Sequence, residues 1–253
     1  MPGEFNNNKI PYLSIIVPAF NEAERLSETL KRIVAFAEAR EKVATEIIVV
    51  DNGSTDATKE IVMEFCSRYP FVKYLYQATR GKGAAVRTGM LAAEGEYMFI
   101  CDADMAVPID EALNFLPPVL QDYDIAIGSR EAEGARRYDE PFHRHLMGRV
   151  FNLIVRVLLL SGLSDTQCGF KCFRHDVAHE LFSAGRINGW SFDVEVLYIA
   201  RLKGYRIVEV PVNWYYGEKS KVSPVRDTWL MLKEVLWIRK HWKKKQGFAT
   251  RAY

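Results

Sequence analysis

Two aspartates, Asp102 and Asp104, follow directly on an apolar stretch in the segment YMFICDADM. The apolar residues predict a buried strand, and side chains two positions apart in an extended segment point the same way, so we expect both carboxylates to face one site. Two close carboxylates repel each other unless a cation lies beside them. Oxygen ligands of this kind suit Mg²⁺ or Mn²⁺, which commonly also contact a substrate's phosphates. A solvated turn is the alternative explanation of so short a motif.

Further polar residues follow other apolar stretches of the first half. Asp51 ends the segment TEIIVVD, where a carboxylate could accept hydrogen bonds from the base or the ribose of a nucleotide. In ATRGKGAAVRTG, small residues would let a ligand approach the backbone, and Arg80 and Lys82 could contact a diphosphate; an ordinary strand-to-helix turn is the alternative. Neither G-x-G-x-x-G nor G-x-x-x-x-G-K-[ST] occurs, which argues against dinucleotide oxidoreductases and P-loop phosphotransferases.

The elements that must position these residues are alternating strands and helices. Apolar stretches predict five strands, over residues 12–20, 45–51, 71–77, 96–102 and 123–130, and helical patterns lie between the first four. The strands are continuously apolar, which indicates burial on both faces. This is typical of an α/β fold with a mostly parallel, doubly wound sheet and helices on both faces, which binds ligands beyond the carboxyl ends of its strands. The acids fall at such ends.

The pattern changes after residue 130. We expect, in order, a long amphipathic helix over about 143–163, a strand in DTQCGFKCF, a helix over 190–205, a strand over 206–214 and a final helix from about 225. Cys168, Cys172, His175 and His179 superficially resemble a zinc set, but their spacing is too short for a zinc finger. Burial of the two cysteines as small apolar side chains is the favoured interpretation.

Composition limits the partners and the compartment. The chain has 253 residues, is 49% hydrophobic and carries a formal net charge of +2, so it lacks the general positive field of a nucleic-acid-binding protein. Four cysteines and no secretory signal before the first strand favour a reducing, cytoplasmic setting. No uncharged apolar segment reaches the roughly 18–20 residues of a membrane span, so any membrane contact is expected to be peripheral.

Two helical segments carry residues suited to a membrane surface. The first places Val150, Phe151, Ile154, Val157 and Leu158 near one face, and the last helix combines Trp229, Leu232, Leu236, Trp237 and Trp242 with a basic tail. Aromatic and basic residues together suit an interface with anionic lipids. A core-facing stripe followed by a solvated lysine run is the alternative.

Five segments together resemble family 2 glycosyltransferases with the A-type nucleotide-sugar fold, namely SIIVPAFNE, EIIVVDNGSTD, RGKGAAVRTG, CDADM and IAIGSR. The later segments DTQCGFKCF, WSFDVEVLYIA, VEVPVNW and KSKVSPVRD are similar to those of dolichyl-phosphate β-glucosyltransferases, and mannosyl relatives resemble the chain less. The resemblance covers about residues 12–238. It implies a single glycosyltransferase domain over 1–253, with a nucleotide-sugar half over about 12–130, an acceptor half over about 131–225 and a basic amphipathic helix over about 226–253.

The resemblance also implies roles for individual residues. The residues expected to bind the nucleotide sugar are Pro18, Phe20, Asn21, Glu22, Asp51, Gly81 and Lys82. The residues expected to be catalytic are Asp102, Asp104 and Arg130, and the two aspartates are expected to bind Mg²⁺ or Mn²⁺. The acceptor phosphate is expected to be bound by Arg130, Arg144 and Lys221. Mannosyl relatives carry a further glutamine ligand two residues after the second aspartate. Ala106 stands there, so ligation would rest on two carboxylates, substrate and water.

The implied reaction is inverting transfer of glucose from UDP-glucose to a dolichyl or other polyprenyl phosphate, by an enzyme lying peripherally on the cytoplasmic face of a membrane. A phosphate monoester has a second pKa of about 6, so this nucleophile needs no strong general base. Three alternatives remain: another sugar, such as mannose, on the same lipid; a saccharide acceptor, with Asp139 or Glu140 as base; and a non-catalytic binding module. Asp165, Asp193 and Glu195 are at least as well suited to a structural network as to catalysis.

Overall fold

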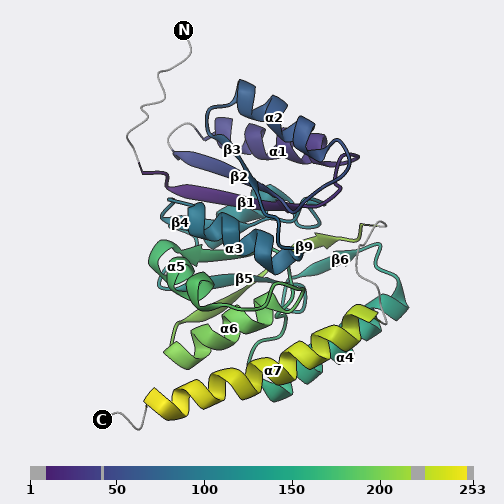
Figure 1. Ribbon diagram of the computed structural model, residues 1–253, viewed down its shortest axis with the longest axis vertical. Coiled ribbons are helices and arrows are strands. Elements are labelled where there is room, and N and C mark those ends of the chain that lie inside the picture. Colours follow the sequence, from purple (N-terminus) through teal and green to yellow (C-terminus); the bar gives the residue numbers. More distant parts are fainter. Residues whose placement is uncertain (1–9, 41–42, 218–225, 250–253) are drawn as a thin grey trace.

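The computed structural model describes residues 10–40, 43–217 and 226–249. Its centre is a seven-stranded sheet with the strand order β3-β2-β1-β4-β7-β5-β8 (Figure 1). The strands are β1 (Leu13–Ala19), β2 (Thr45–Asp51), β3 (Val72–Tyr76), β4 (Tyr97–Ile100), β5 (Ile125–Ser129), β7 (Lys171–Arg174) and β8 (Ile207–Pro211). β7 is antiparallel to both of its neighbours, and all other pairings in this sheet are parallel.

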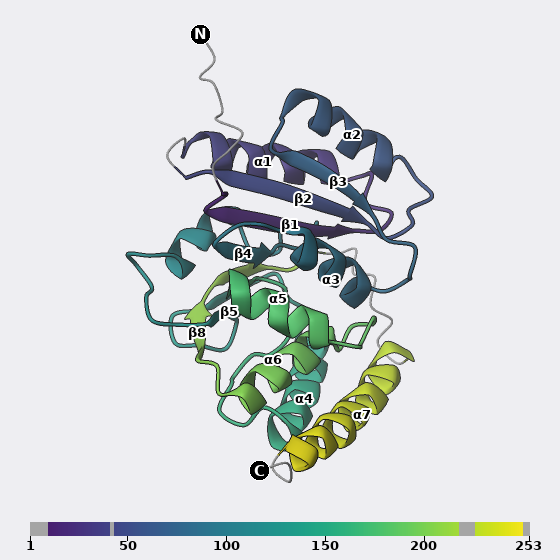
Figure 2. The ribbon, with the colours of Figure 1, turned by 60° about the vertical axis from the view of Figure 1, so that its left-hand side comes forward.

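Helices cover both faces of this sheet (Figure 2). One layer holds α1 (Leu26–Glu38), α2 (Thr58–Arg68) and the 3₁₀ helix η1 (Ile109–Phe115), and the other holds α3 (Lys82–Ala92), α4 (Phe142–Leu158), α5 (His175–Ala184), α6 (Phe192–Lys203) and α7 (Arg226–Ala249). In β1, Ile15 and Val17 pack in the first layer and Ile16 in the second, because successive strand residues point to opposite faces. Continuous apolar strands therefore reflect burial on both sides.

The carboxyl ends of β1, β2, β4 and β5 open on one edge of the sheet, because these strands run in the same direction. The segments that follow them, which begin at Phe20, Asn52, Cys101 and Arg130, meet there. β7 runs the opposite way, so the residues that precede it reach the same edge. Ligands of doubly wound sheets bind at this edge.

A second, two-stranded parallel sheet formed by β6 (Arg136–Tyr138) and β9 (Asn213–Tyr215) adjoins the first. The rings of Tyr138 and Tyr215 stack with centroids 4.5 Å apart. The expected single strand over 206–214 is therefore wrong, because the chain leaves the main sheet after Pro211 and pairs again with β6. Helix α5 is a further element that was not predicted.

The zinc-like residues separate into two structural roles. Cys168 and Cys172 are buried in the core against the sheet. The ring nitrogens of His175 and His179, on α5, lie 3.2 and 3.1 Å from the carbonyl oxygens of Gly95 and Ala93. The four side chains therefore have different surroundings.

Candidate active site

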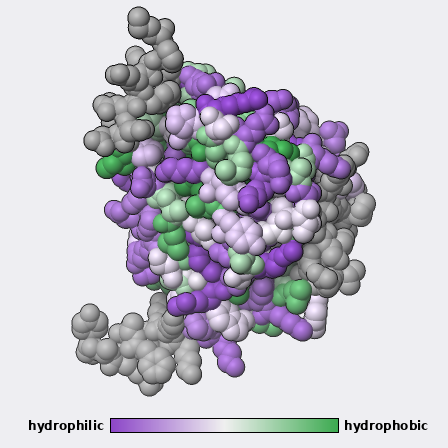
Figure 3. All heavy atoms as spheres, turned by 45° about the horizontal axis from the view of Figure 1, so that its top comes forward, coloured by the Kyte–Doolittle hydropathy of each residue, from purple (hydrophilic) through white to green (hydrophobic). Residues whose placement is uncertain are grey.

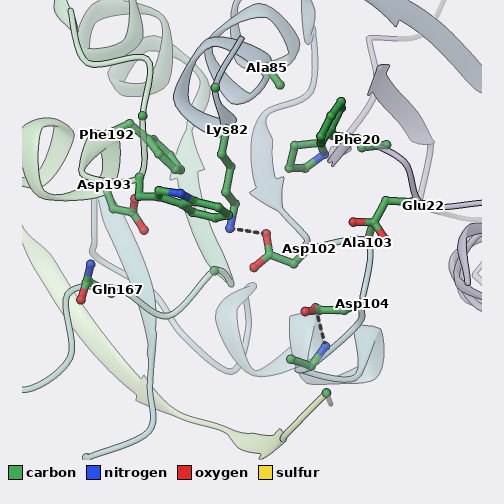
Figure 4. Close-up of a pocket in the computed structure, with 18 of the residues that line it drawn as sticks. Phe20, Glu22, Lys82, Ala85, Asp102, Ala103, Asp104, Gln167, Phe192 and Asp193 are labelled. Carbon is green, nitrogen blue, oxygen red and sulfur yellow. Dashed lines mark hydrogen bonds and ion pairs between the residues drawn. The ribbon is translucent and has the colours of Figure 1, made fainter. Parts of the chain in front are cut away.

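A cavity of about 870 Å³ opens at the carboxyl edge of the sheet, which is a usual size for a small-molecule site. Both halves of the chain contribute to its wall (Figure 4). Among the predicted site residues, the wall contains Pro18, Phe20, Glu22, Gly81, Lys82, Asp102, Asp104 and Arg130. The acids expected to handle a metal and the arginine expected to hold the acceptor thus border one space.

The two aspartates reach this cavity from a tight turn. β4 ends at Ile100, and the N–H of Met105 donates to the carbonyl oxygen of Asp102 at 2.9 Å. Met105 has a φ of 48°, in the left-handed region. The expectation of an extended segment here is wrong, yet the turn still brings both carboxylates to the cavity wall.

Lys82 supplies a fixed positive charge beside the first of these acids. Its Nζ lies 2.6 Å from Asp102 Oδ1 (Figure 4). The centroid of the Trp190 ring is 5.7 Å from the same nitrogen. Burial alone would lower the pKa of Lys82, but the charges of Asp102 and Asp193 outweigh it and raise the pKa. The ammonium group is therefore charged at neutral pH and directly available to a diphosphate in the cavity.

Asp104 forms no salt bridge with any cationic side chain in the described part of the chain. The side chain of Asp104 is exposed to solvent, but the surrounding protein removes part of its hydration. This partial desolvation is the larger cause that raises the pKa of Asp104, and the negative charge of Asp102 is the next. Asp104 Oδ1 accepts a hydrogen bond from the N–H of Ala106 at 3.1 Å.

These carboxylates fit a divalent cation that is held by few protein ligands. In the described ranges, no group of three or more His, Cys, Asp or Glu side chains is arranged around a common metal position. Asp102 and Asp104 could hold Mg²⁺ or Mn²⁺, and substrate oxygens and water would complete the coordination. The side chain of Ala106 has no ligand atom to add.

The RGKG loop is fixed to the sheet by a residue that the sequence did not single out. The side chain of Asn52, at the end of β2, donates to the carbonyl oxygens of Gln77 and Thr79 at 2.9 and 2.7 Å and accepts from the N–H of Gly81 at 2.8 Å. Gly81 has a φ of 128°, and a Cβ there would lie 2.1 Å from the carbonyl oxygen of Asn188. Only glycine fits this position, from which α3 and Lys82 begin.

Asp51 and Asn21 are absent from the described residues that line the cavity. The carboxylate of Asp51 accepts hydrogen bonds from Ser54 N–H at 2.9 Å and from Tyr74 Oη at 3.0 Å, and burial together with this bond raises the pKa of Tyr74 to about 12. Asn21 Oδ1 accepts from Thr55 N–H at 2.8 Å. Both side chains brace loops beside the cavity, and their contact with a nucleotide stays a prediction.

Arg130 enters the cavity from the end of β5 and is held by Asp165. Its Nε and Nη2 lie 2.6 and 2.9 Å from the two carboxylate oxygens, which is a bidentate ion pair. Burial alone would raise the pKa of Asp165, but the charge and the hydrogen bonds of Arg130 hold it well below its usual range. The ring of Trp214 lies 5.5 Å from the guanidinium carbon of Arg130. A permanent, well-positioned cation thus faces the cavity.

The other two predicted phosphate ligands have side chains outside the part of the chain that the structure describes. Lys221 lies outside the described residues, and Arg144 belongs to α4 but its side chain lies outside the described part of the chain. Glu140, considered as a base, does line the cavity. Its Oε2 lies 2.6 Å from Arg137 Nη1 and 3.0 Å from His145 Nδ1, so this carboxylate is already engaged.

Several residues of the wall were given no site role from the sequence, namely Arg25, Asn52, Gln167, Gly169, Trp190, Phe192, Trp214 and Met231. Most of them lie within or beside the segments DTQCGF, GWSFDVE and VEVPVNW that carry the resemblance. The aromatic and polar residues of those segments could therefore have been predicted to line the site.

Replacing Gly169 with alanine is expected to lower kcat/KM about 100-fold. The added Cβ would lie 2.0 Å from Asp102 Oδ2, so the carboxylate would have to move away from its position beside Lys82, and a displacement of about 1 Å can cost this much in rate. Gly185→Ala is the control, because its Cβ would meet no atom closer than 3.5 Å. Steady-state kinetics with a thermal melt of each variant test this, and full activity of folded Gly169→Ala would contradict it.

Comparison with known proteins agrees with this geometry. The sequence pattern of the family described as Glycosyl transferase family 2 matches residues 14–182. The chain is 36% identical over 241 residues to a human protein named dolichyl-phosphate beta-glucosyltransferase, a match that covers 90% of this chain and 74% of the relative. A Saccharomyces cerevisiae protein of the same name is 28% identical over 255 residues, with 93% and 76% covered.

Solved structures share the fold at lower identity. Glucosyl-3-phosphoglycerate synthase from Mycobacterium tuberculosis, in complex with Mn²⁺ and UDP-glucose, has a TM-score of 0.64 at 17% identity and covers 90% of this chain and 79% of its own. A mannosyltransferase from Pyrobaculum calidifontis, in complex with GDP-mannose and Mn²⁺, has a TM-score of 0.59 at 22% identity, with 85% and 59% covered. The predicted A-type α/β fold is confirmed. The chain is a glycosyltransferase, and it belongs to glycosyl transferase family 2.

Proposed function

We propose that this enzyme transfers glucose from UDP-glucose to dolichyl phosphate or another polyprenyl phosphate, with inversion, to give a lipid-linked β-glucosyl phosphate. The observation that carries the proposal is that Asp102, Asp104 and the half-buried cation Arg130 border the same cavity. Such a cavity suits two phosphate-bearing substrates that must approach each other. The names of the relatives support the lipid phosphate and the glucose. The fold neighbour bound to UDP-glucose and Mn²⁺ supports the donor and the metal.

The acceptor would be positioned by charge and would need no general base. A phosphate monoester is mostly ionised at neutral pH, because its second pKa is about 6. Arg130 is held by Asp165 with its guanidinium at the cavity wall, where it would bind this phosphate. Glu140, one of the two carboxylates considered as a base for a saccharide acceptor, is already paired with Arg137.

The donor diphosphate would lie between the aspartates and Lys82. Asp102 and Asp104 would hold Mg²⁺ or Mn²⁺, and the bound ion would stabilise the negative charge of the leaving diphosphate. Lys82 Nζ adds a further positive charge 2.6 Å from Asp102. Catalysis would thus depend mainly on positioning and on electrostatic stabilisation.

A transfer assay tests this function. The purified protein, a short polyprenyl phosphate, detergent and Mn²⁺ are incubated in turn with labelled UDP-glucose, UDP-galactose, UDP-N-acetylglucosamine and GDP-mannose. We expect label from UDP-glucose in an organic-extractable lipid from which mild acid releases the sugar. Label from another donor would change the sugar assignment. The absence of labelled lipid with every donor would overturn the proposal, and UDP binding without turnover would favour a binding module.

We further propose that α4 and α7 hold the enzyme peripherally on a membrane. Both helices contribute to the cavity wall, through Phe151 and Met231 among others, so a surface that they form would adjoin the site. Their exposed large apolar side chains are Val150, Leu153, Val157, Trp229, Leu230, Leu236 and Trp237. On the face drawn in Figure 3, hydrophobic residues are instead scattered among hydrophilic ones. Two expected members of this surface, Phe151 and Trp242, are buried, which corrects the sequence prediction.

The mode and side of attachment are part of the same proposal. No described helix combines the length and the apolar character that a membrane crossing requires. The four cysteines are free thiols, which suits a reducing compartment. We therefore place the reaction on the cytoplasmic face.

Trp229→Ala is expected to weaken binding to vesicles containing phosphatidylserine roughly tenfold or more, because burying a large apolar side chain contributes about 1.5–3 kcal/mol. Trp229 is 61% exposed on α7. Met63→Ala is the control, because Met63 is 48% exposed on α2, in the opposite layer. Flotation with increasing lipid measures the partition coefficient. Equal partitioning of the two variants would contradict a membrane role for this part of α7.

A further inference from the structure

Asp193 lines the cavity with a buried carboxylate oxygen that has no hydrogen-bond partner among the described residues. The residue is 6% exposed, and the unpaired atom is Oδ1. Its other oxygen, Oδ2, accepts a hydrogen bond from Lys171 Nζ at 2.9 Å. Folded proteins rarely leave a buried acceptor unpaired, because the cost of its desolvation is then not recovered. The free oxygen therefore indicates a ligand group that donates a hydrogen bond.

This oxygen is rigidly held before any ligand arrives. Lys171 is 2% exposed in β7, where it stands in register between Ile100 of β4 and Ile127 of β5. Its Nζ also donates to the carbonyl oxygen of Cys168. Asp193 itself lies in the first turn of α6. Because Lys171 and Asp193 both belong to regular secondary structure, binding of a ligand here would require little reorganisation of the site and would lose little free energy to it.

The position of Asp193 in the cavity indicates which part of a substrate would reach it. In Figure 4, Phe20 and Glu22 lie on one side, Asp102 and Lys82 lie in the middle, and Asp193 lies on the other side with Gln167. On the proposed function, the nucleotide occupies the first side and the diphosphate the middle. The sugar attached to that diphosphate then extends toward Asp193.

The chemistry of the free oxygen agrees with a sugar and not with a phosphate. A carboxylate accepts hydrogen bonds from hydroxyl groups and repels an anionic phosphate. We propose that Asp193 accepts a hydrogen bond from one hydroxyl group of the transferred hexose and thereby selects the sugar. This inference rests on the proposed function and deepens it, because it assigns the residue that recognises the donor's sugar.

The test is a cycle that changes the protein and the ligand together. Isothermal titration with Mn²⁺ measures Kd for UDP, UDP-glucose and its 2-, 3-, 4- and 6-deoxy analogues, with wild type and with Asp193→Ala. We expect one analogue to bind wild type about 10- to 100-fold more weakly than UDP-glucose, as for a lost hydrogen bond to a charged group. The same analogue should bind Asp193→Ala within about threefold of UDP-glucose, while the Kd of UDP changes little.

Two further variants separate the loss of sugar recognition from a loss of folding. The Asp193→Leu, Lys171→Met double variant removes both members of the buried ion pair, and should fold even if Asp193→Ala leaves Lys171 unpaired and unstable. It should lose the same discrimination. Asp176→Ala, at an exposed position on α5, should keep it.

The outcomes separate the two claims. Equal penalties for each deoxy analogue on wild type and on the variants, with UDP-glucose bound and transferred, would overturn the role of Asp193 alone. A drop in kcat that is the same for every donor, with unchanged Kd ratios, would also overturn it. Failure of wild type to bind or transfer any nucleotide sugar would overturn the proposed function together with this inference.

Discussion

Asp104→Asn is expected to lower kcat/KM for sugar transfer about 10²- to 10³-fold, which is typical for the loss of one group that stabilises transition-state charge. Asparagine keeps the shape of the side chain and removes its charge, which we propose attracts the divalent cation. Asp104 is a sharper test than Asp102, because Asp102 is paired with Lys82 and its replacement would also leave the Lys82 ammonium group without its carboxylate partner. Asp104 has no such partner among the described cations.

The measurement combines kinetics with binding of the metal alone. Mn²⁺ titrations followed by electron paramagnetic resonance should show weaker binding to Asp104→Asn, and raised Mn²⁺ should recover part of the activity. Asp122→Asn is the matched control, since Asp122 is exposed and is not among the described residues that line the cavity. A variant that retains wild-type kcat/KM and Mn²⁺ affinity would show that this carboxylate holds no metal.

The sheet and the acids at its edge could be predicted because their signals are local. Continuous apolar strands before Asp51 and Asp102 indicate burial on both faces, and in a parallel sheet such acids lie at one edge. The helix over 175–184 was also predictable, because Val177, Ala178, Leu181 and Phe182 have helical spacing. Its omission was an error of interpretation.

The details of the site could not be predicted, because they depend on residues distant in sequence. Arg130 and Asp165 are 35 positions apart, and they meet because an antiparallel strand, β7, lies between the parallel strands β4 and β5. Nothing in the apolar pattern of the segment around 171 distinguishes an antiparallel from a parallel strand. The turn after β4 likewise depends on the left-handed backbone of Met105, a residue type with no preference for that conformation.

The free oxygen of Asp193 illustrates the same limit. The sequence places Asp193 and Lys171 22 positions apart and gives no sign that they pair. Only the register of β7 brings the lysine beneath the first turn of α6. Motifs thus locate the edge of the sheet at which the chemistry takes place. The packing of the second half then decides which charges are paired and which remain for substrates.

Asp165→Asn is expected to reduce the free energy of unfolding by about 3–5 kcal/mol at pH 7, which is the usual cost of removing one member of a buried ion pair. Asp165 is 1% exposed, and its carboxylate accepts hydrogen bonds from the backbone N–H, Nε and Nη2 of Arg130. An asparagine would leave the guanidinium without its counter-charge. Glu28→Gln is the control, because Glu28 and Arg32 form an exposed pair, and such pairs contribute about 0–1 kcal/mol.

The stability difference between wild type and Asp165→Asn should depend on pH in a defined direction. Arg130 holds the folded-state pKa of Asp165 below its unfolded value of about 3.9, so the stabilisation is fully present above about pH 5. It should be lost progressively as the pH falls below the unfolded pKa toward the lower folded one. Urea unfolding at pH 7, 5, 4 and 3 measures this. A difference below about 1 kcal/mol at pH 7, or one that does not shrink in acid, would mean that the ion pair contributes little to the stability of the fold.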